Sequence, residues 1–360
     1  MIDAAAHARL LAGYCIDVQP GEQVVVRAGA GAAPLVLALQ REILERGGWP
    51  LLRVALPGQD EGWWAAARDE HLDAVAPAEW AETEGTDAAI SVHSPDNATA
   101  LAAVDPARMA RAARARTALR EAAMRRRWCV TVWPVPALAQ QAGLGTAAFA
   151  ELVRRALFLD RPDPVAAWRE LSERQARLID RLAGARELRI EAPGTDLTLS
   201  VEGRTWVNSD GRRNMPSGEV FTGPREDSAR GTVRFTVPSS PGGVDVAGVE
   251  LRFEDGRVVD ARAERGQEYL RETLATDDGA ARLGEIGIGT NDGIRRATGM
   301  ILLDEKIGGT VHLALGRSYP ETGGVNASAV HWDLICDLRE DGRLTADGAV
   351  VVRDGVFTAS

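Results

Sequence analysis

The sequence of 360 residues contains only three cysteines, Cys15, Cys129 and Cys336, and no Cys-x-x-Cys pair. An odd number of widely spaced cysteines argues against a disulfide scaffold and a zinc ribbon, and it is typical of a reducing compartment. Long apolar runs are also missing: no segment approaches about 18 uninterrupted apolar residues, and no basic start precedes such a run at the N-terminus. We therefore expect a cytoplasmic protein without a signal peptide or a membrane span.

Positive charge is in short supply, because 42 Lys and Arg residues face 52 Asp and Glu residues and leave a net charge of −10. This balance repels polyanions, so nucleic acid is not an expected partner. The local exception is an arginine- and alanine-rich run from Arg108 to Arg127. Such a run favours the solvated face of a helix over an anion-binding patch.

The length exceeds one ordinary hydrophobic core, and 45% hydrophobic with 26% charged residues is typical of a globular protein, so we expect two domains. The first half alternates strand-like with helix-like segments, which indicates βαβ units around a mostly parallel sheet. The expected strands are 23–27, 51–56, 88–92 and 129–133, and a helix is expected at 34–46. The turn Ala28–Pro34 lacks the third glycine of a dinucleotide-binding loop, which disfavours a nicotinamide site.

From about Glu187 the pattern changes to alternating apolar and polar residues between glycine-rich turns, which predicts antiparallel β structure. These segments are 188–190, 197–201, 233–237 and 249–253. Two helices precede the change, one centred on 149–156 and one at 164–182, in which Trp168, Leu171 and Ile179 recur at helical spacing. We therefore expect an α/β domain at 1–185 with a mostly parallel sheet, followed by a β-rich α+β domain at 186–360.

His331 and Asp333 stand two residues apart in a segment with a strand-like pattern, so their side chains project from the same face. A nitrogen and a carboxylate oxygen that converge in this way suit zinc, cobalt, manganese or iron(II) better than calcium. Taken alone, the pair favours a core histidine beside a surface aspartate, because short motifs give false positives. A second histidine, His312, lies in the same C-terminal stretch.

Two glutamates in the β-rich half occupy unusual surroundings. Glu219 follows a Pro-x-Gly turn and enters a Val-Phe-Thr strand, and Glu285 lies between glycines in an apolar stretch. Burying an isolated carboxylate is costly, so a glutamate in such surroundings should be paired or bound to a cation. For either one alone, exposure at a turn is an equally good interpretation.

Taken together, these segments resemble the thermophilic-type metallo-aminopeptidases, the family of aminopeptidase T and aminopeptidase S. The matching segments are Asn214-Met-Pro-Ser-Gly-Glu-Val-Phe-Thr222, Leu283-Gly-Glu285, Asp304-Glu-Lys-Ile-Gly-Gly-Thr-Val-His312, Gly316-Arg-Ser-Tyr319 and Ser328-Ala-Val-His-Trp-Asp333. The opening segment Cys15–Glu22 is also similar, so the resemblance spans essentially the whole chain. Several motifs in the right order are far more specific than any single one.

The resemblance implies a metal-dependent aminopeptidase whose second domain is the metal-binding, catalytic one. It implies a cocatalytic pair of divalent ions, with Zn, Co, Mn or Mg as candidates, and peptides with a free N-terminus as substrates. The implied ligands are Glu219, Glu285, His312, Tyr319, His331 and Asp333. Two ions about 3.5–4 Å apart can activate a water and polarise the scissile carbonyl together. Glu219 is weakly favoured as the proton acceptor, and Tyr319 is either a ligand or a hydrogen-bond donor to the oxyanion.

Some alternatives stay open at this point. Lys306 and Arg225 lie within or beside the motifs, where a structural ion pair is favoured over contact with substrate. The apolar stripe of the helix at 164–182 is expected to be core or inter-domain packing. The resemblance also implies a homodimer, for which the same stripe would need a partner surface. The main rival function is a mononuclear iron(II) ring-cleaving dioxygenase that uses His312, His331 and Asp333. Such a site has no need of Glu219 and Glu285, so the aminopeptidase is favoured.

Overall fold

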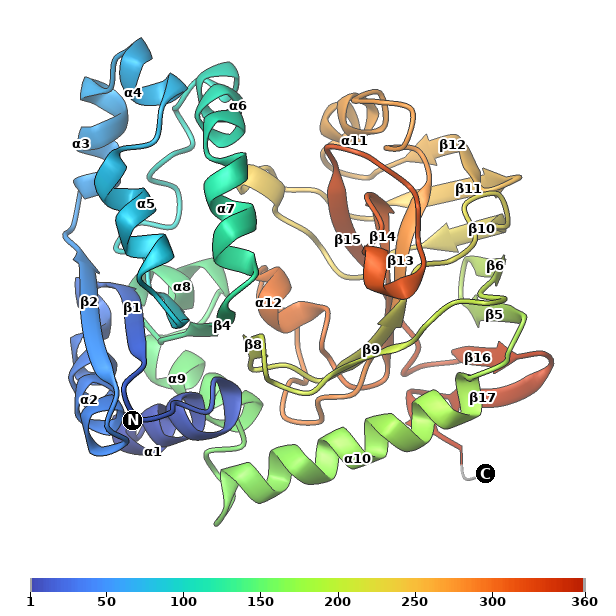
Figure 1. The fold of residues 1–360 in the computed structure, drawn as a ribbon. Helices are drawn as coiled ribbons and strands as arrows, with labels where there is room; N and C mark the ends of the chain where they lie inside the picture. The colour runs from blue at the N-terminus through green and yellow to red at the C-terminus, as the bar shows by residue number, and fades with distance from the viewer. Residues whose placement is uncertain (1, 359–360) are drawn as a thin grey trace. The chain divides into compact units, whose positions relative to one another are not determined.

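The computed structural model describes residues 2–358, which divide into two compact units. The first unit contains the residues up to Val165 together with Gly211–Pro216, and the second contains Ala166–Asp210 with the residues from Ser217 onward. Each unit has its own sheets, as the ribbon in Figure 1 shows. Within the described range, no helix has the length and apolar character needed to cross a membrane.

The first unit is built on a five-stranded parallel sheet with the order β2-β1-β3-β4-β8, and this confirms the predicted parallel sheet. Its strands are β1 (Gln23–Gly29), β2 (Trp49–Ala55), β3 (Ala88–His93), β4 (Arg127–Val132) and β8 (Asn214–Met215). Its helices are α1 (Ala4–Arg9), α2 (Ala33–Glu45), α3 (Gln59–Ala66), α4 (Asp69–Asp73), α5 (Pro77–Glu84), α6 (Pro106–Ala115), α7 (Thr117–Met124), α8 (Pro136–Gln141) and α9 (Thr146–Ala156). The central strands β1 and β3 are largely buried, as at Val24, Val25 and Ile90, because helices follow the strands in βαβ order, whereas the edge strand β2 is partly exposed.

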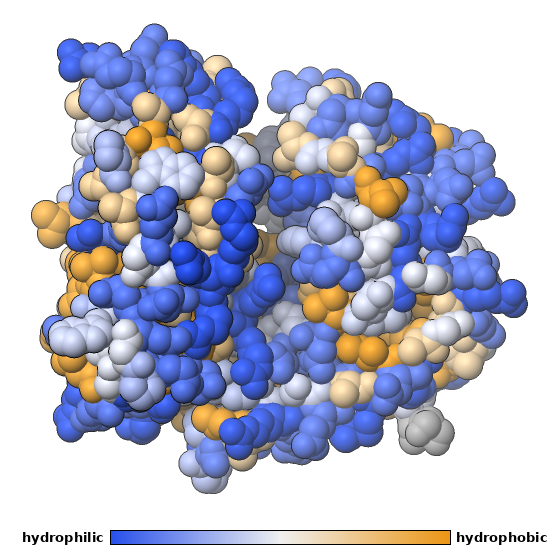
Figure 2. All heavy atoms as spheres, viewed as in Figure 1, coloured by the Kyte–Doolittle hydropathy of each residue, from blue (hydrophilic) through white to orange (hydrophobic). Residues whose placement is uncertain are grey.

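The arginine-rich run forms α6 and α7, and its charges are partly paired. Arg111 forms ion pairs with Asp69 and Asp73, and Arg116 lies 3.7 Å from Glu79. These partners lie on the neighbouring helices α4 and α5. The run is therefore a solvated, ion-paired helix surface, and hydrophilic side chains cover much of the face of the molecule in Figure 2.

The second unit contains one long helix, α10 (Pro164–Leu182), and two antiparallel sheets. The eight-stranded sheet has the order β12-β11-β10-β6-β5-β16-β17-β18, and the five-stranded sheet has the order β15-β14-β13-β9-β7. The first comprises β5 (Glu187–Ala192), β6 (Thr195–Ser200), β10 (Arg230–Arg234), β11 (Glu250–Glu254), β12 (Arg257–Arg262), β16 (Arg343–Ala346), β17 (Ala349–Arg353) and β18 (Val356–Phe357). The second comprises β7 (Val207–Ser209), β9 (Glu219–Thr222), β13 (Leu283–Gly289), β14 (Thr310–Gly316) and β15 (His331–Asp337), and two short helices, α11 (Gln267–Leu274) and α12 (Ile301–Asp304), complete the unit.

One hydrophobic core joins these elements, and α10 contributes to it. Leu178 and Leu182 belong to the core cluster, Ile179 packs against it, and Trp168 and Leu171 are fully buried within the chain. The interpretation that this stripe needs a partner surface is therefore wrong. We expected the second domain to begin near residue 186, but its unit begins at Ala166, because α10 packs on the core of the β sheets.

Candidate metal centre

The antiparallel five-stranded sheet of the second unit brings most of the predicted site residues together. Glu219 begins β9, Glu285 lies in β13, His312 lies in β14, and His331 and Asp333 lie in β15. These four strands are neighbours in the sheet, so residues more than 100 positions apart in sequence share one face. His312 is fully buried, and Glu219 and Glu285 are each only 5% exposed.

The side chains form two groups that share Glu285. Glu219, Glu285 and His312 each offer one ligand atom within 4.8 Å of the others, and so do Glu285, His331 and Asp333. We call these the first and second triads. In the first, His312 Nε2 lies 3.2 Å from Glu285 Oε1 and 3.4 Å from Glu219 Oε2. In the second, His331 Nε2 lies 3.7 Å from Glu285 Oε2 and 3.6 Å from Asp333 Oδ2.

These separations fit ligands around a common cation. Two ligand atoms at about 2.05 Å from a tetrahedral ion lie about 3.3 Å from each other, which is longer than a good hydrogen bond. The four separations of 3.2–3.7 Å lie near this value. A set of carboxylate and imidazole donors is also the chemistry that zinc, cobalt and manganese accept. The residues present therefore fit a divalent metal in each triad.

The two histidines differ in their hydrogen bonds: His331 bonds through Nδ1, whereas His312 Nε2 lies 3.2 Å from Glu285 Oε1. His331 Nδ1 lies 2.9 Å from the carbonyl oxygen of Arg317, so Nδ1–H donates there and Nε2 keeps its lone pair for the second triad. His312 Nδ1 is buried and has no hydrogen-bond partner among residues 2–358. The ring of His331 is thus oriented by a hydrogen bond to the backbone, whereas the ring of His312 is oriented by packing.

The packing that orients His312 depends on a glycine. Gly287 on β13 pairs with His312 on β14 in the antiparallel ladder. A Cβ atom at Gly287 would lie 2.1 Å from both Cε1 and Nε2 of the imidazole ring. The ring therefore occupies the space that the side chain of any other residue at 287 would fill, whereas a Cβ atom at Gly284 would lie 2.3 Å from the carbonyl oxygen of Gly316.

With protein groups alone, the excess of carboxylates perturbs every ionisable group in the first triad. Burial favours neutral Glu219, but Lys306 and His312 outweigh burial and hold its pKa below the usual value. Burial, Asp333 and Glu219 raise the pKa of Glu285. Burial lowers the pKa of His312, but its hydrogen bond to Glu285 and the charges of Glu219 and Glu285 raise it to about 10. Such a site attracts a cation, and a divalent ion would replace the proton on His312.

Tyr319 packs beside His331 of the second triad. Its ring centroid is 5.0 Å from that of His331 in an edge-on arrangement and 5.7 Å from that of Phe221. Burial and the charges of Glu285 and Asp333 raise the pKa of Tyr319 above its usual value.

The rival iron site requires His312, His331 and Asp333 around one ion. In the described part of the chain, these residues do not form one group: His312 converges with Glu219, whereas His331 and Asp333 converge with the other oxygen of Glu285. The mononuclear arrangement therefore has less support than the dinuclear one.

The two basic residues within or beside the motifs, Lys306 and Arg225, have different environments in the structure. Lys306 is completely buried, and its Nζ lies 3.0 Å from Glu219 Oε1 and also contacts Glu305. Burial lowers its pKa, but Glu219 and Glu305 outweigh burial and raise the pKa above its usual value. Arg225 is exposed and has no ion pair within the described residues. Lys306 thus forms the expected ion pair, and its partner Glu219 is one of the predicted site residues.

Sequence reasoning missed Glu305, whose side chain is only 15% exposed and contacts Lys306. It also missed the signal that singles out Lys306. This residue is the only lysine of the chain, since the other 41 of the 42 Lys and Arg residues are arginines.

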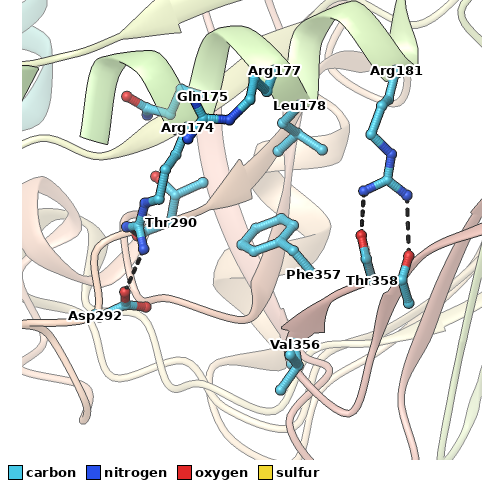
Figure 3. Close-up of a pocket in the computed structure, with 11 residues that line it drawn as sticks. Arg174, Gln175, Arg177, Leu178, Arg181, Thr290, Asp292, Val356, Phe357 and Thr358 are labelled. Atoms are coloured by element: carbon cyan, nitrogen blue, oxygen red, sulfur yellow. Dashed lines mark hydrogen bonds and ion pairs between the residues drawn. The ribbon is translucent and has the colours of Figure 1, made fainter. Parts of the chain in front are cut away.

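A cavity of about 510 Å³ in the second unit contains none of the six predicted site residues. It is lined by α10 and the turn after β17, and in Figure 3 Leu178 and Phe357 lie between Arg174 at one end and Arg181 at the other. Arg174 donates a hydrogen bond to the carboxylate of Asp292, and Arg181 donates one to the carbonyl oxygen of Thr358. Gln175 of this wall donates from Nε2 to the carbonyl oxygen of Glu219 at 2.6 Å, so α10 supports the main chain at the start of β9.

Comparison with known proteins gives consistent results. The sequence profile of the thermophilic metalloprotease family matches residues 3–357. Aminopeptidase 2 of Geobacillus stearothermophilus is 36% identical over 397 residues, covering 95% of this chain and 94% of that protein. The solved structure of wild-type AmpT from Thermus thermophilus has a TM-score of 0.83 at 27% identity, with 99% of each chain covered. The 2,5-dihydroxypyridine dioxygenase of Pseudomonas putida has a TM-score of 0.62 at 16% identity over 100% of this chain and 99% of that one, which shows a shared fold alone.

Proposed function

Because the chain belongs to the thermophilic metalloprotease family and is therefore a metallo-aminopeptidase, a hydrolase acting on peptide bonds, we propose that its activity depends on two divalent ions that share Glu285. Glu219 and His312 complete the first site, and His331 and Asp333 complete the second. The substrates are peptides with a free N-terminus.

The observation that carries this proposal is the orientation of one carboxylate. Glu285 Oε1 faces His312 at 3.2 Å, whereas Glu285 Oε2 faces His331 at 3.7 Å. A carboxylate whose two oxygens face two different imidazoles is suited to bridge two ions. A single ion would leave one triad of buried or half-buried ligands uncompensated, at the cost of burying charge.

Two divalent ions, when bound, supply Lewis acidity at the scissile carbonyl and lower the pKa of water. The protein's part is to hold the ligands and to place a donor near the reacting carbonyl. Tyr319 packs edge-on against His331, and in this proposal its hydroxyl donates a hydrogen bond to a developing oxyanion. Glu219 Oε1 is paired with Lys306 Nζ at 3.0 Å, and Oε2 faces His312 Nε2 at 3.4 Å, which supports a ligand role over that of proton acceptor.

Metal content measured together with turnover tests the proposal. The wild type should contain two ions per chain and hydrolyse aminoacyl chromogenic amides. Glu219→Gln keeps the shape but removes one charge, so it should retain one ion and lose turnover by orders of magnitude. One ion per chain in both proteins, with no hydrolysis of any aminoacyl amide, would contradict the aminopeptidase mechanism and favour the iron dioxygenase.

We also propose that the protein is a homodimer. The support for this proposal is the family resemblance alone, because the apolar stripe of α10 packs within the chain. Light scattering at micromolar concentration tests it directly. A mass near 38.5 kDa would show a monomer and exclude the homodimer.

A further inference from the structure

The only lysine of the chain lies in the proposed metal site. The other 41 of the 42 Lys and Arg residues are arginines, including those on exposed helix surfaces, where lysine and arginine are usually exchangeable. Lys306 is instead completely buried. Arginine and lysine differ most at buried sites, because an ammonium is a compact point charge and a guanidinium is a wide planar fork. The composition therefore marks the one position where this chain uses the compact cation.

The main chain around Lys306 is fixed by the end of β13. The carbonyl oxygen of Lys306 accepts a hydrogen bond from the Asn291 amide at 3.0 Å. A Cβ atom at Gly289 would lie 2.1 Å from the carbonyl oxygen of Ile307, so the chain at 306–307 passes directly against this glycine. Gly289 is also the residue that pairs with Glu219 in the ladder. Lys306 and Glu219 are thus anchored against the same position of β13.

At its other end, Lys306 fixes the orientation of the Glu219 carboxylate. Its Nζ forms an ion pair with Glu219 Oε1 at 3.0 Å. This pairing directs the other oxygen, Oε2, toward His312 Nε2, which lies 3.4 Å away. No hydrogen-bond partner for Oε2 exists among residues 2–358. A carboxylate held by one oxygen has a single oxygen to offer to a metal. Groups that orient metal ligands in this way commonly change metal affinity by 10–100-fold when they are removed.

We propose that Lys306 is a positioning residue that acts through Glu219 and sets the metal affinity of the first triad. This inference rests on the proposed two-metal function. Among residues 2–358, the ion pairs of Lys306 Nζ are with Glu219 and Glu305, and neither belongs to the second triad, so the affinity of the second site should not depend on Lys306. An arginine at this position would not restore the function, because its fork does not fit a closed space between Glu219 and Glu305.

Cobalt titration of the apoprotein by calorimetry tests the inference. Lys306→Met should weaken one of two Co²⁺ sites at least tenfold and leave the other within about twofold. Lys306→Arg should weaken the same site. Arg343→Met, which removes an ion pair to Glu191 in the eight-stranded sheet of the same unit, is the matched control and should leave both sites unchanged.

A double-mutant cycle separates positioning from a merely structural role. In the Glu219→Gln background, the weakened first site is titrated at high Co²⁺ concentration, and Lys306→Met should cost that site no further affinity, because the carboxylate that Lys306 orients is gone. An equal cost in both backgrounds would overturn the inference. If Lys306→Met does not fold, the cycle is run on Lys306→Met/Glu305→Gln, which removes the buried cation and one of its carboxylates together.

A spectroscopic measurement needs no variant of Lys306. Protein labelled with ¹⁵N-lysine gives a single side-chain Nζ signal, because the chain has one lysine. That signal should shift when Co²⁺ or Zn²⁺ fills the first triad and again in Glu219→Gln. An unmoved signal would overturn the inference. The two proposals fail differently: a wild type with fewer than two ions contradicts the two-metal function, whereas two wild-type affinities in Lys306→Met contradict the role of Lys306 alone.

Discussion

Gly287→Ala is the most direct perturbation of the site that the structure offers, because it adds one methyl group and changes no charge. The new Cβ would lie 2.1 Å from Cε1 and Nε2 of His312. Carbon atoms in ordinary contact lie about 3.5–4.0 Å apart, so the ring must move by more than about 1 Å. Both residues are buried in the antiparallel five-stranded sheet, so the ring cannot simply turn out into solvent.

The displacement is large compared with what a metal site tolerates. Ligand distances hold within about 0.2 Å, so a shift of about 1 Å removes His312 from the first triad. We expect the affinity of that site for Zn²⁺ or Co²⁺ to fall at least about 100-fold, which corresponds to about 2.7 kcal/mol. Overpacking should cost about 1–3 kcal/mol of folding free energy in addition. Turnover should fall with the loss of the first ion.

Metal titration, thermal unfolding and turnover of an aminoacyl amide, measured on the same preparations, check this prediction. Gly62→Ala is the matched control, because it adds the same methyl group in α3 with nothing within 4 Å, and it should leave all three quantities unchanged or slightly raise stability. A Gly287→Ala protein with two tightly bound ions and wild-type turnover would refute the assignment of His312 as a ligand held over Gly287.

Three further predictions follow from the same structure. A chelator should abolish activity and zinc, cobalt or manganese should restore it, while circular dichroism shows a retained fold; complete unfolding would mean that the metal is structural. Tyr319→Phe should lower kcat about 100-fold with the metal content unchanged, whereas loss of an ion would make Tyr319 a ligand. Burial lowers the pKa of His7 from 6.5 to about 3, so the unfolded chain binds the proton more readily and stability falls as the pH drops below 6.5. At pH 5 this loss is about 2 kcal/mol, and His7→Gln should flatten the pH dependence of unfolding in that range.

The parallel sheet of the first unit was predictable because its strands are short apolar runs followed by helices. Val24, Val25 and Ile90 are buried on both faces of the sheet, and such burial leaves a clear signal in the sequence. The fifth strand, β8, has only two residues and joins β4 from a distant part of the chain. A strand of that length has no periodicity, so only the tertiary pairing reveals it.

The helix α10 shows where periodicity stops being informative. Its apolar stripe predicted a buried face, and Trp168 and Leu171 are indeed buried. Spacing does not say which surface covers a stripe, and the covering surface determines whether the helix belongs to the first domain, the second domain or a partner. Here Leu178 and Leu182 enter the core of the second unit, which moves the boundary to Ala166.

For the metal centre, the sequence supplied the ligand candidates but not their division into two groups. That division depends on register: Gly287 lies opposite His312, Ala314 lies opposite Asp333, and the pairing shifts between Leu283 and Glu285. A shift of one residue moves a side chain to the other face of a sheet, so this irregularity determines where Glu285 points. No motif encodes it locally.

Lys306 illustrates the opposite case, in which a signal was present in the sequence but needed the structure for its interpretation. A single lysine among 41 arginines is visible in the composition. By composition alone it could be an accident at an exposed position, where either residue suffices. Its complete burial and its contact with Glu219 remove that interpretation, because an uncompensated buried cation is costly and a paired one constrains its partner. The pairing in turn leaves Glu219 one oxygen for the first triad, which connects the composition of the whole chain to the geometry of one ligand.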